Sequence, residues 1–341
     1  MILNILIILA VFSLLFYIVT YPYDFKLERK LRRVKSFPEV SYVSKEDKSF
    51  NRYDFDKIEE FLNIEEKFLK SVHVDEEMRY ILVTPKGKIK EDTPCLFLLH
   101  GIRDYPEDWI NRAYLLENYL TLKEMNLVDD IIFILPASGF NGESWYTNFF
   151  EDKNHKYENY FTGELYEEAR KISPKGKIGI AGFSMGGYGA FKLGLMHPEK
   201  YSVIGSFSGA VSLIRMSVNR RVMRVMKYVY IPKFLFNDLD KSLFIRIFSS
   251  WGWRILKQDP YSIIKVIESE RLKGKKFYIS VGAEDKKPYL MLQQWIDIVG
   301  RLKKYGVDFK GYIYKDEVHT WEYISKDLPN FICYFNQQIK K

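Results

Sequence analysis

The chain has 341 residues, of which 47% are hydrophobic and 16% aromatic. This length suits one large domain with additions, or two domains at most, with ample material for a core. It has two cysteines, Cys95 and Cys333, and five histidines without ligand-like spacing, which argues against a disulfide framework, a metal site or another cofactor. The formal charge is +8, but no aromatic-basic recognition motif accompanies it, so we expect no nucleic acid partner.

The N-terminal segment has the pattern of a membrane anchor. Residues 1–20 contain no charged side chain, and residues 26–35 then carry six basic side chains and one acidic one. About 20 apolar residues in a helix are enough to span a bilayer. Because the basic cluster follows the apolar stretch and no small-residue cleavage site ends it, the pattern favours an uncleaved anchor over a signal peptide. We therefore predict a single-pass protein of the cell membrane, anchored through residues 1–23, with the remaining chain on the cytoplasmic side.

After the anchor we expect a basic juxtamembrane linker over residues 24–50 and one large domain over residues 51–341. Residues 53–71 show helical spacing of apolar side chains. Short apolar segments then alternate with helical patterns, which predicts an α/β domain with a doubly wound, mostly parallel sheet. The predicted strands are 78–84, 94–99, 130–135, 177–181, 201–207, 276–281 and 309–314; predicted helices include 111–126, 157–171, one that ends at Met196, and 331–339.

Residues 182–186 read Gly-Phe-Ser-Met-Gly, a G-x-S-x-G motif between a predicted strand and a predicted helix. A nucleophilic serine at the tip of a strained turn needs neighbours without side chains, because strand and helix pass close on both sides. The helix N-terminus also directs backbone N–H groups toward the place where an oxyanion would form. We therefore predict that Ser184 is a nucleophile; the alternative is an incidental serine in a tight turn.

A serine hydroxyl becomes a good nucleophile when a base takes its proton and an acid orients that base. For a serine on such an elbow, the partners follow in the order acid, then histidine. His319 comes after the last predicted strand, whereas His197 precedes a proline at a helix end and suits a capping or packing role. The acid should follow the preceding strand. Asp285, three residues after Gly282, is the preferred acid, and Glu284 is the alternative.

Two backbone N–H groups are predicted to form the oxyanion hole. One belongs to Met185, the residue after the nucleophile. The second should come from the loop after the strand 94–99, where Gly101 allows a turn, and Ile102 is the predicted donor. His100 in the same loop suits bracing of the loop better than proton transfer.

Further short motifs extend well beyond the elbow. They are residues 98–102 with Trp109, 143–148, 157–158, 164–165, 182–190, 197–199, 206–209 and 319–321. In this combination the chain resembles the putative-esterase family of α/β-hydrolases, over about residues 75–340. That family includes S-formylglutathione hydrolase, feruloyl esterase domains, tributyrin-type esterases and the antigen 85 mycolyltransferases. The resemblance implies an α/β-hydrolase fold, an acyl-serine mechanism with Ser184, Asp285 and His319, and a substrate-side wall from Trp145 and Tyr146.

Residues 211–260 depart from that family, whose connection at this point is shorter. They contain ten Lys or Arg and three Asp, together with many large apolar side chains. Arg220, Arg224 and Lys227 share one face of a predicted helix, and Val218, Val222, Val225 and Val229 share another. We expect an inserted helical cap over the catalytic end of the sheet. A basic amphipathic helix of this kind suits a lipid surface, so the cap is a candidate second membrane contact; a solvated basic side is the alternative.

These observations together predict a membrane-anchored serine esterase that cleaves carboxylic esters of small-molecule or lipid-like type through an acyl-enzyme. An acyltransferase would use the same side chains with an alcohol in place of water, and sequence does not separate the two, because water exclusion is a property of the closed site. The alternative of a different class is a non-catalytic membrane scaffold with a hydrolase fold. The complete set of serine, acid and histidine argues against it.

Overall fold

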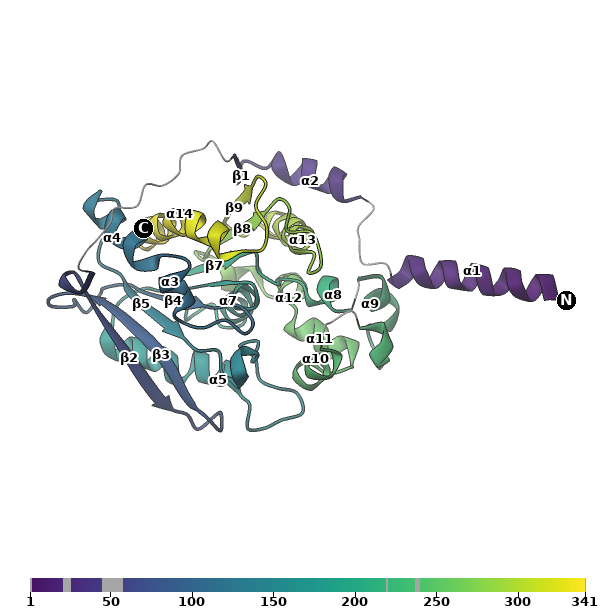
Figure 1. The fold of residues 1–341 in the computed structure, drawn as a ribbon, viewed down its shortest axis with the longest axis horizontal. Coiled ribbons are helices and arrows are strands. Elements are labelled where there is room, and N and C mark those ends of the chain that lie inside the picture. The colour runs from purple at the N-terminus through teal and green to yellow at the C-terminus, as the bar shows by residue number, and fades with distance from the viewer. Residues whose placement is uncertain (1, 21–25, 45–57, 219, 237–239, 341) are drawn as a thin grey trace.

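The computed structural model describes residues 2–20, 26–44, 58–218, 220–236 and 240–340. Within these ranges the chain forms a single nine-stranded sheet with helices on both faces (Figure 1). The strands are β1 (Val40–Val43), β2 (Leu62–Lys70), β3 (Glu77–Pro85), β4 (Cys95–Leu99), β5 (Ile132–Pro136), β6 (Ile178–Phe183), β7 (Val203–Phe207), β8 (Lys276–Gly282) and β9 (Phe309–Tyr314).

The sheet has the spatial order β1-β9-β8-β7-β6-β4-β5-β3-β2. β3 pairs antiparallel with both β2 and β5, and all other neighbours are parallel. The central strands β4 to β7 are buried along their whole length. A parallel strand covered on both faces needs apolar side chains on both, which explains why these segments are continuous apolar runs without polar alternation. The predicted α/β class with a mostly parallel sheet is confirmed.

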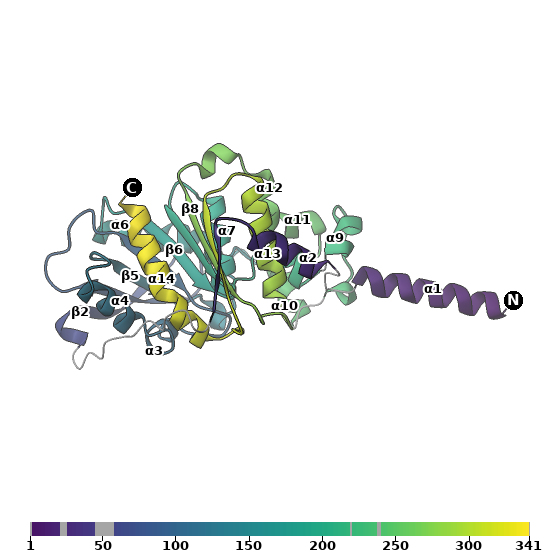
Figure 2. The same cartoon turned by 90° about the horizontal axis from the view of Figure 1, so that it is seen from above.

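Helices cover the two faces of the sheet and build two separate apolar clusters with it (Figure 2). One face carries α5, α6, α7, α12 and α13, and the other carries α3, α4 and α14. The predicted helix 157–171 is interrupted at Gly163. The bounds are α3 (Asp108–Asn111), α4 (Leu115–Glu124), α5 (Tyr157–Thr162), α6 (Glu164–Ile172), α7 (Met185–Met196), α12 (Pro260–Val266), α13 (Met291–Lys304) and α14 (Trp321–Ile339).

The helix predicted over residues 53–71 is wrong. Residues 53–57 lie outside the described part of the chain, and Leu62–Lys70 form the edge strand β2. This strand pairs with β3 in a continuous antiparallel register that starts with Leu62 opposite Pro85. Phe68 nevertheless stays exposed at the edge. Local spacing suggested a helix, but backbone pairing with a distant segment of the chain decided the structure.

The segment predicted as a linker contributes two ordered elements. α2 (Leu27–Lys35) buries Leu27 and Val34, which lie two turns apart on one helix face, and it packs against α13. β1 extends the sheet by parallel pairing with β9. Residues 36–44 of the predicted linker therefore lead into the sheet itself.

The N-terminal helix α1 (Ile2–Thr20) projects away from the domain in both views (Figures 1 and 2). Its side chains from Ile2 to Tyr17 are exposed. In the part of the chain that the structure describes, no helix combines the length and the apolar character needed to cross a membrane. The transmembrane anchor predicted over residues 1–23 is therefore not supported, and neither are the single-pass localisation and the orientation that depended on it.

The described residues between β7 and α12 form four further α-helices, which we call the cap helices. The amphipathic helix predicted from Val218 to Val229 is shorter than expected, because α9 ends at Met226. Val218 and Val222 are buried, whereas Val225 and Val229 are exposed, so the four valines do not share one buried face. The cap helices are α8 (Leu213–Met216), α9 (Arg220–Met226), α10 (Lys241–Phe248) and α11 (Gly252–Gln258); the 3-10 helices within the described ranges are η1 (Ile58–Glu60), η2 (Phe140–Gly142), η3 (Lys233–Leu235) and η4 (Ser269–Leu272).

Candidate active site

Ser184 lies at the junction of β6 and α7, where the backbone adopts φ 56° and ψ −115°. A positive φ is uncommon for a residue with a side chain and persists only where the surroundings hold it. A Cβ on Gly182 would come within 2.3 Å of the Gly186 backbone, and a Cβ on Gly186 within 2.1 Å of the Leu99 carbonyl oxygen. The two glycines are therefore required by close packing, and the turn presents the serine at the carboxyl edge of the sheet.

The structure brings Ser184, His319 and Asp285 into one hydrogen-bonded chain. The Ser184 Oγ lies 2.9 Å from Nε2 of His319, and Nδ1 of His319 lies 2.7 Å from Oδ2 of Asp285. With its proton on Nδ1, the imidazole donates to the buried carboxylate and leaves Nε2 free to accept the serine proton. Glu284, the alternative acid, is half exposed, and its carboxylate lies 2.9 Å from Nζ of Lys286. The geometry favours Asp285.

Loops after β8 and β9 position the acid and the histidine. The Asp285 carbonyl accepts a hydrogen bond of 2.8 Å from the Leu292 N–H in α13, which holds the acid loop against that helix. The His319 ring packs against Phe183, with ring centroids 4.7 Å apart, and against Tyr289 at 5.9 Å. Aromatic rings from two different segments of the chain therefore contact the imidazole and restrict its orientation.

The two predicted oxyanion donors, Met185 and Ile102, both line the cavity beside Ser184. Met185 is the first residue of α7, and Ile102 lies in the loop after β4. Among the described residues, neither backbone N–H donates to a protein acceptor. The first N–H groups of a helix have no partner inside it, so the Met185 amide can bind an anion there. The loop with Ile102 is held by a hydrogen bond of 2.9 Å from the Arg103 N–H to the Gly142 carbonyl.

His100 braces this oxyanion loop from inside the protein. Its Nδ1 donates to the Gly101 carbonyl at 2.8 Å, and its Nε2 accepts the Ser138 N–H at 2.9 Å. Burial lowers the pKa of His100 to about 4, which keeps the ring neutral at neutral pH. A neutral ring with both nitrogens engaged has a structural role, as the sequence suggested.

A cavity of about 400 Å³ opens onto the Ser184 side chain. The cap contributes an apolar wall from Met216, Leu243 and Phe244, with Asp240 beside it. Charged side chains from the loops on the other side complete the cavity. They are Arg103, Asp104, Arg112 and Glu143. Burial raises the pKa of Asp104, whose carboxylate accepts a hydrogen bond of 3.2 Å from the Trp321 indole. The lining of the cavity thus combines apolar side chains from the cap with charged side chains from the segments after β4 and β5.

The two residues predicted to form the substrate-side wall lie in different places. Trp145 lines the cavity and packs edge-on against Phe248 of the cap, with ring centroids 5.6 Å apart. Tyr146 is fully buried and is not among the residues that line the cavity. Its hydroxyl donates to the His100 carbonyl at 2.9 Å. Tyr146 therefore supports the oxyanion loop from behind, and the prediction that it contacts substrate is not supported.

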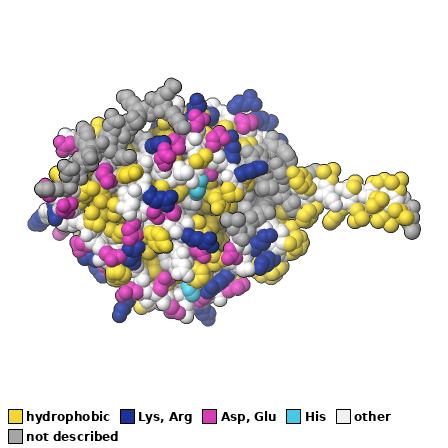
Figure 3. Space-filling model, viewed as in Figure 1, with side chains coloured by type: hydrophobic (Ala, Val, Ile, Leu, Met, Phe, Trp, Pro, Cys, Tyr) yellow, Lys and Arg dark blue, Asp and Glu magenta, His cyan; other side chains and the backbone are white. Residues whose placement is uncertain are grey.

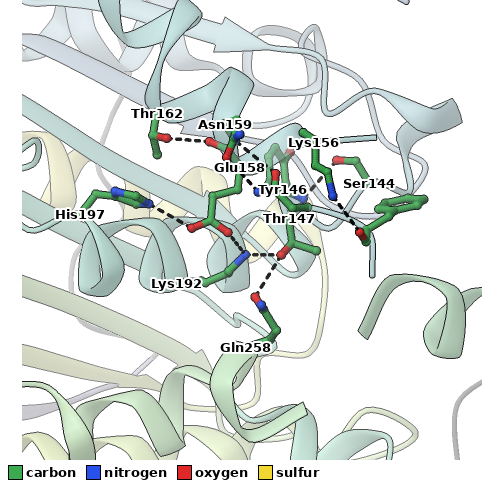
Figure 4. Close-up of polar contacts among 12 residues, drawn as sticks. Ser144, Tyr146, Thr147, Lys156, Glu158, Asn159, Thr162, Lys192, His197 and Gln258 are labelled. Carbon is green, nitrogen blue, oxygen red and sulfur yellow. Dashed lines mark hydrogen bonds and ion pairs between the residues drawn. The ribbon is translucent and has the colours of Figure 1, made fainter. Parts of the chain in front are cut away.

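Sequence reasoning missed a buried ionic network around Lys192 and Glu158 (Figure 4). Lys192 of α7 is 1% exposed, and its Nζ contacts the Thr147 hydroxyl and lies 2.5 Å from Oε2 of Glu158. Nε2 of His197 lies 3.0 Å from Oε1 of the same carboxylate, and the Thr147 hydroxyl donates to the Gln258 side chain at 3.2 Å. The network therefore joins α7, α5, the loop that carries Trp145, and α11 of the cap.

The charges of this network compensate one another. Burial alone would raise the pKa of Glu158, but Lys192 and His197 outweigh it and lower the pKa to about 2. Burial lowers the pKa of Lys192, and the attraction of Glu158 opposes that change. The signal in the sequence was a lysine inside the otherwise apolar, glycine-rich helix α7. A buried lysine needs an acidic partner, but the sequence did not show which acid.

Comparison with known proteins places the chain among esterases. The model of the family described as putative esterase matches residues 71–331. An acetyl esterase from Caldicellulosiruptor saccharolyticus is 24% identical over 248 residues, which are 70% of this chain and 82% of that protein. The structure of a ferulic acid esterase superposes with a TM-score of 0.63 at 18% identity, over 82% of this chain and 99% of the other. An S-formylglutathione hydrolase from Agrobacterium tumefaciens gives 0.63 at 16% identity, over 80% and 94%. The two structural likenesses show a shared fold.

Proposed function

We propose, on the premise that the chain belongs to the putative-esterase family and is a carboxylic ester hydrolase, that it works through an acyl-enzyme on Ser184. The Ser184 Oγ attacks the ester carbonyl carbon while Nε2 of His319 takes the hydroxyl proton. Asp285 keeps the imidazole in the required tautomer and stabilises its charged form. The N–H groups of Met185 and Ile102 stabilise the developing oxyanion.

Collapse of the tetrahedral intermediate completes acylation and sets up the second half of the reaction. The bond between the carbonyl carbon and the alcohol oxygen breaks, and His319 gives its proton to the departing alcohol. A water molecule then enters. His319 takes a proton from this water as its oxygen attacks the acyl carbon, and returns the proton to Ser184 as the acid leaves. The observation that carries this proposal is the chain of contacts of 2.9 and 2.7 Å from serine to histidine to acid at the edge of the cavity.

A fluorophosphonate probe tests the nucleophile directly, because it forms a covalent bond with an activated serine. We expect labelling of the wild type at Ser184, confirmed by peptide mapping, and no labelling of Ser184→Ala. Ser202→Ala is the matched control, since Ser202 lies before β7 and does not line the cavity. A labelled Ser184→Ala variant, or an unlabelled wild type that is folded, would contradict the proposal.

The same side chains would also support acyl transfer to an alcohol. Turnover of an ester in water with and without added glycerol, followed by separation of the free acid from the glyceryl ester, measures the partition. We expect free acid as the main product in both conditions. A dominant glyceryl ester would assign the chain to acyl transfer while retaining the acyl-enzyme.

The cavity further suggests the kind of ester. We propose a substrate with one apolar arm, which lies against Met216, Leu243 and Phe244 of the cap, because apolar surface gains free energy when it is removed from water. For p-nitrophenyl esters of increasing acyl length, kcat/KM should rise from acetyl to butyryl and hexanoyl. Leu243→Ser should reduce that rise and change acetyl ester turnover little. Leu256→Ser, on α11 and outside the cavity, is the matched control. A strict acetyl preference in the wild type would overturn this assignment.

A further inference from the structure

A second cleft, separate from the active site, lies between α2, α12 and α13. Its volume is about 400 Å³, and it shares no lining residue with the active-site cavity. The apolar floor comes from Val34, Phe37, Tyr261 and Ile296, and its rim is charged. The proposed esterase chemistry uses none of these residues, so the cleft has no assigned role.

The rim of this cleft is strongly basic. Of the described residues that line it, five are basic and one is acidic: Lys30, Arg33, Lys265, Arg301 and Lys304, with Asp297. The Asp297 carboxylate lies 2.5 Å from Arg215, which does not line the cleft, and 3.4 Å from Nζ of Lys30. In Figure 3, Lys and Arg side chains gather over α2 on the face shown. The cleft therefore carries an excess of positive charge after its own ion pairs are counted.

Helix C-termini explain part of this basic composition, but their partial negative charge is smaller than the positive charge of the lining side chains. Arg33, Lys265 and Arg301 each lie in the last turn of a different helix, where a cation is favoured. Each helix C-terminus carries about half a negative charge. Three helix C-termini together balance fewer than two of the five positive charges. The negative charge of Asp297 is balanced by Arg215, which lies outside the lining. About three cations therefore remain for an anion in the cleft.

Arg301 is held ready for such an anion. Its guanidinium lies over the Tyr261 ring, 3.4 Å from the ring centroid, and donates to the Tyr261 carbonyl. A stacked guanidinium loses less conformational freedom on binding than a free lysine chain, and its planar N–H groups match the oxygens of phosphate. α2 is fixed in turn, because Leu27 and Val34 are buried against the domain. The basic side chains thus come from elements that are packed in place.

We propose that this cleft binds a phosphate group, carried either by a soluble phosphate ester or by a phospholipid headgroup. The phosphate lies between Arg301 and the basic side chains of α2 and α12, over the apolar floor. Several cations around one phosphate make binding salt-dependent. Dissolved salt weakens the attraction between exposed charges, with a screening length of about 10 Å at 0.1 M salt.

The test compares two triple charge reversals in the full chain. Arg33→Glu/Lys265→Glu/Lys304→Glu changes three exposed residues of the cleft, and Lys86→Glu/Lys88→Glu/Lys90→Glu makes the same change of net charge at the exposed turn after β3. Calorimetry with inorganic phosphate and glycerol 3-phosphate probes the soluble source. Co-sedimentation with phosphatidylcholine vesicles, with and without phosphatidic acid, probes the headgroup. Hydrolysis of a soluble ester should be equal in both variants and the wild type, which shows that both are folded.

We expect the cleft variant to bind at least one probe about tenfold or more weakly than the wild type, and the turn variant to bind like the wild type. Binding of the soluble phosphates alone identifies a phosphate ester as the source, and binding of the acidic vesicles alone identifies a headgroup. Equal losses of binding in the two variants would show that overall net charge causes the effect, and would overturn the proposal. Failure of the wild type to bind either probe would overturn it as well, whatever the esterase activity.

Discussion

Two of the histidine–carboxylate pairs among the described residues lie near the helix that follows Ser184, and only one of these two has the geometry of a catalytic site. Nδ1 of His319 lies 2.7 Å from Asp285 at the cavity, and Nε2 of His197 lies 3.0 Å from Glu158 at the C-terminal end of α7. Exposure does not separate them, since the two histidine side chains are 22% and 29% exposed. The other contacts of the two histidines distinguish the two pairs.

The second ring nitrogen is the difference that matters. In His319 it lies against the Ser184 hydroxyl beside an open cavity, so a proton can pass to and from a substrate. In His197 it lies 3.8 Å from Glu199, and the shared carboxylate of Glu158 is also bound by buried Lys192. The Glu158 carboxylate balances the charge of the buried Lys192 ammonium group, so this pair has a structural role. A histidine–carboxylate pair can act in catalysis only where a third partner and access to a substrate are both present.

The largest expected effect is that of Ser184→Ala, which removes the third partner of the catalytic pair. Turnover of p-nitrophenyl esters should fall on the order of 10⁴ to 10⁶-fold, as for loss of the nucleophile in related chemistry. Thermal unfolding should be nearly unchanged. Activity near that of the wild type in a normally folded variant would remove the distinction between the two pairs.

Asp285→Asn should reduce kcat by about 10⁴-fold, because the amide no longer holds the imidazole in the tautomer that accepts the serine proton. Glu284→Gln, its neighbour, should change kcat less than about twofold, since Glu284 is half exposed and paired with Lys286. Steady-state kinetics on one ester compares them. The reverse ranking would make Glu284 the acid.

Lys192→Met should act on stability instead of chemistry. It leaves Glu158 buried without its main partner, which costs about 3 to 5 kcal/mol of unfolding free energy. Urea unfolding at neutral pH measures this. The double variant Lys192→Met/Glu158→Gln should recover part of the loss, because it removes the orphaned charge. If the double variant were no more stable than the single one, the ion pair would not be the cause.

The smallest effect concerns pH. The pKa of Glu158 in the folded chain, about 2, lies below its ordinary value of 4.5. The stability from this shift is therefore complete above about pH 4.5 and is lost as the pH falls toward 2. The stability difference between the wild type and Lys192→Met/Glu158→Gln should shrink over that interval, as measured by urea unfolding at several pH values. A difference that is constant with pH would contradict the shift.

Several of these features were predictable from sequence because they depend on short-range constraints. The elbow around Ser184 needs glycines where strand and helix touch, so the motif is written in five consecutive residues. The order of serine, acid and histidine follows from the order of strands in the sheet. Buried parallel strands are continuous apolar runs, so β4 to β7 could be predicted from the sequence. The choice between Asp285 and Glu284 needed the side-chain directions of the fold.

The remaining features were decided by contacts between distant segments. β2 is a strand because β3 pairs with it, although its local spacing suggested a helix. Trp145 and Tyr146 are neighbours in sequence, yet one lines the cavity and the other braces His100, because successive side chains point in different directions. The partner of Lys192 is 34 residues away in the chain. Sequence alone determines which side chains can do chemistry, and tertiary packing decides which of them meet, since distances between remote residues are set by how the layers pack.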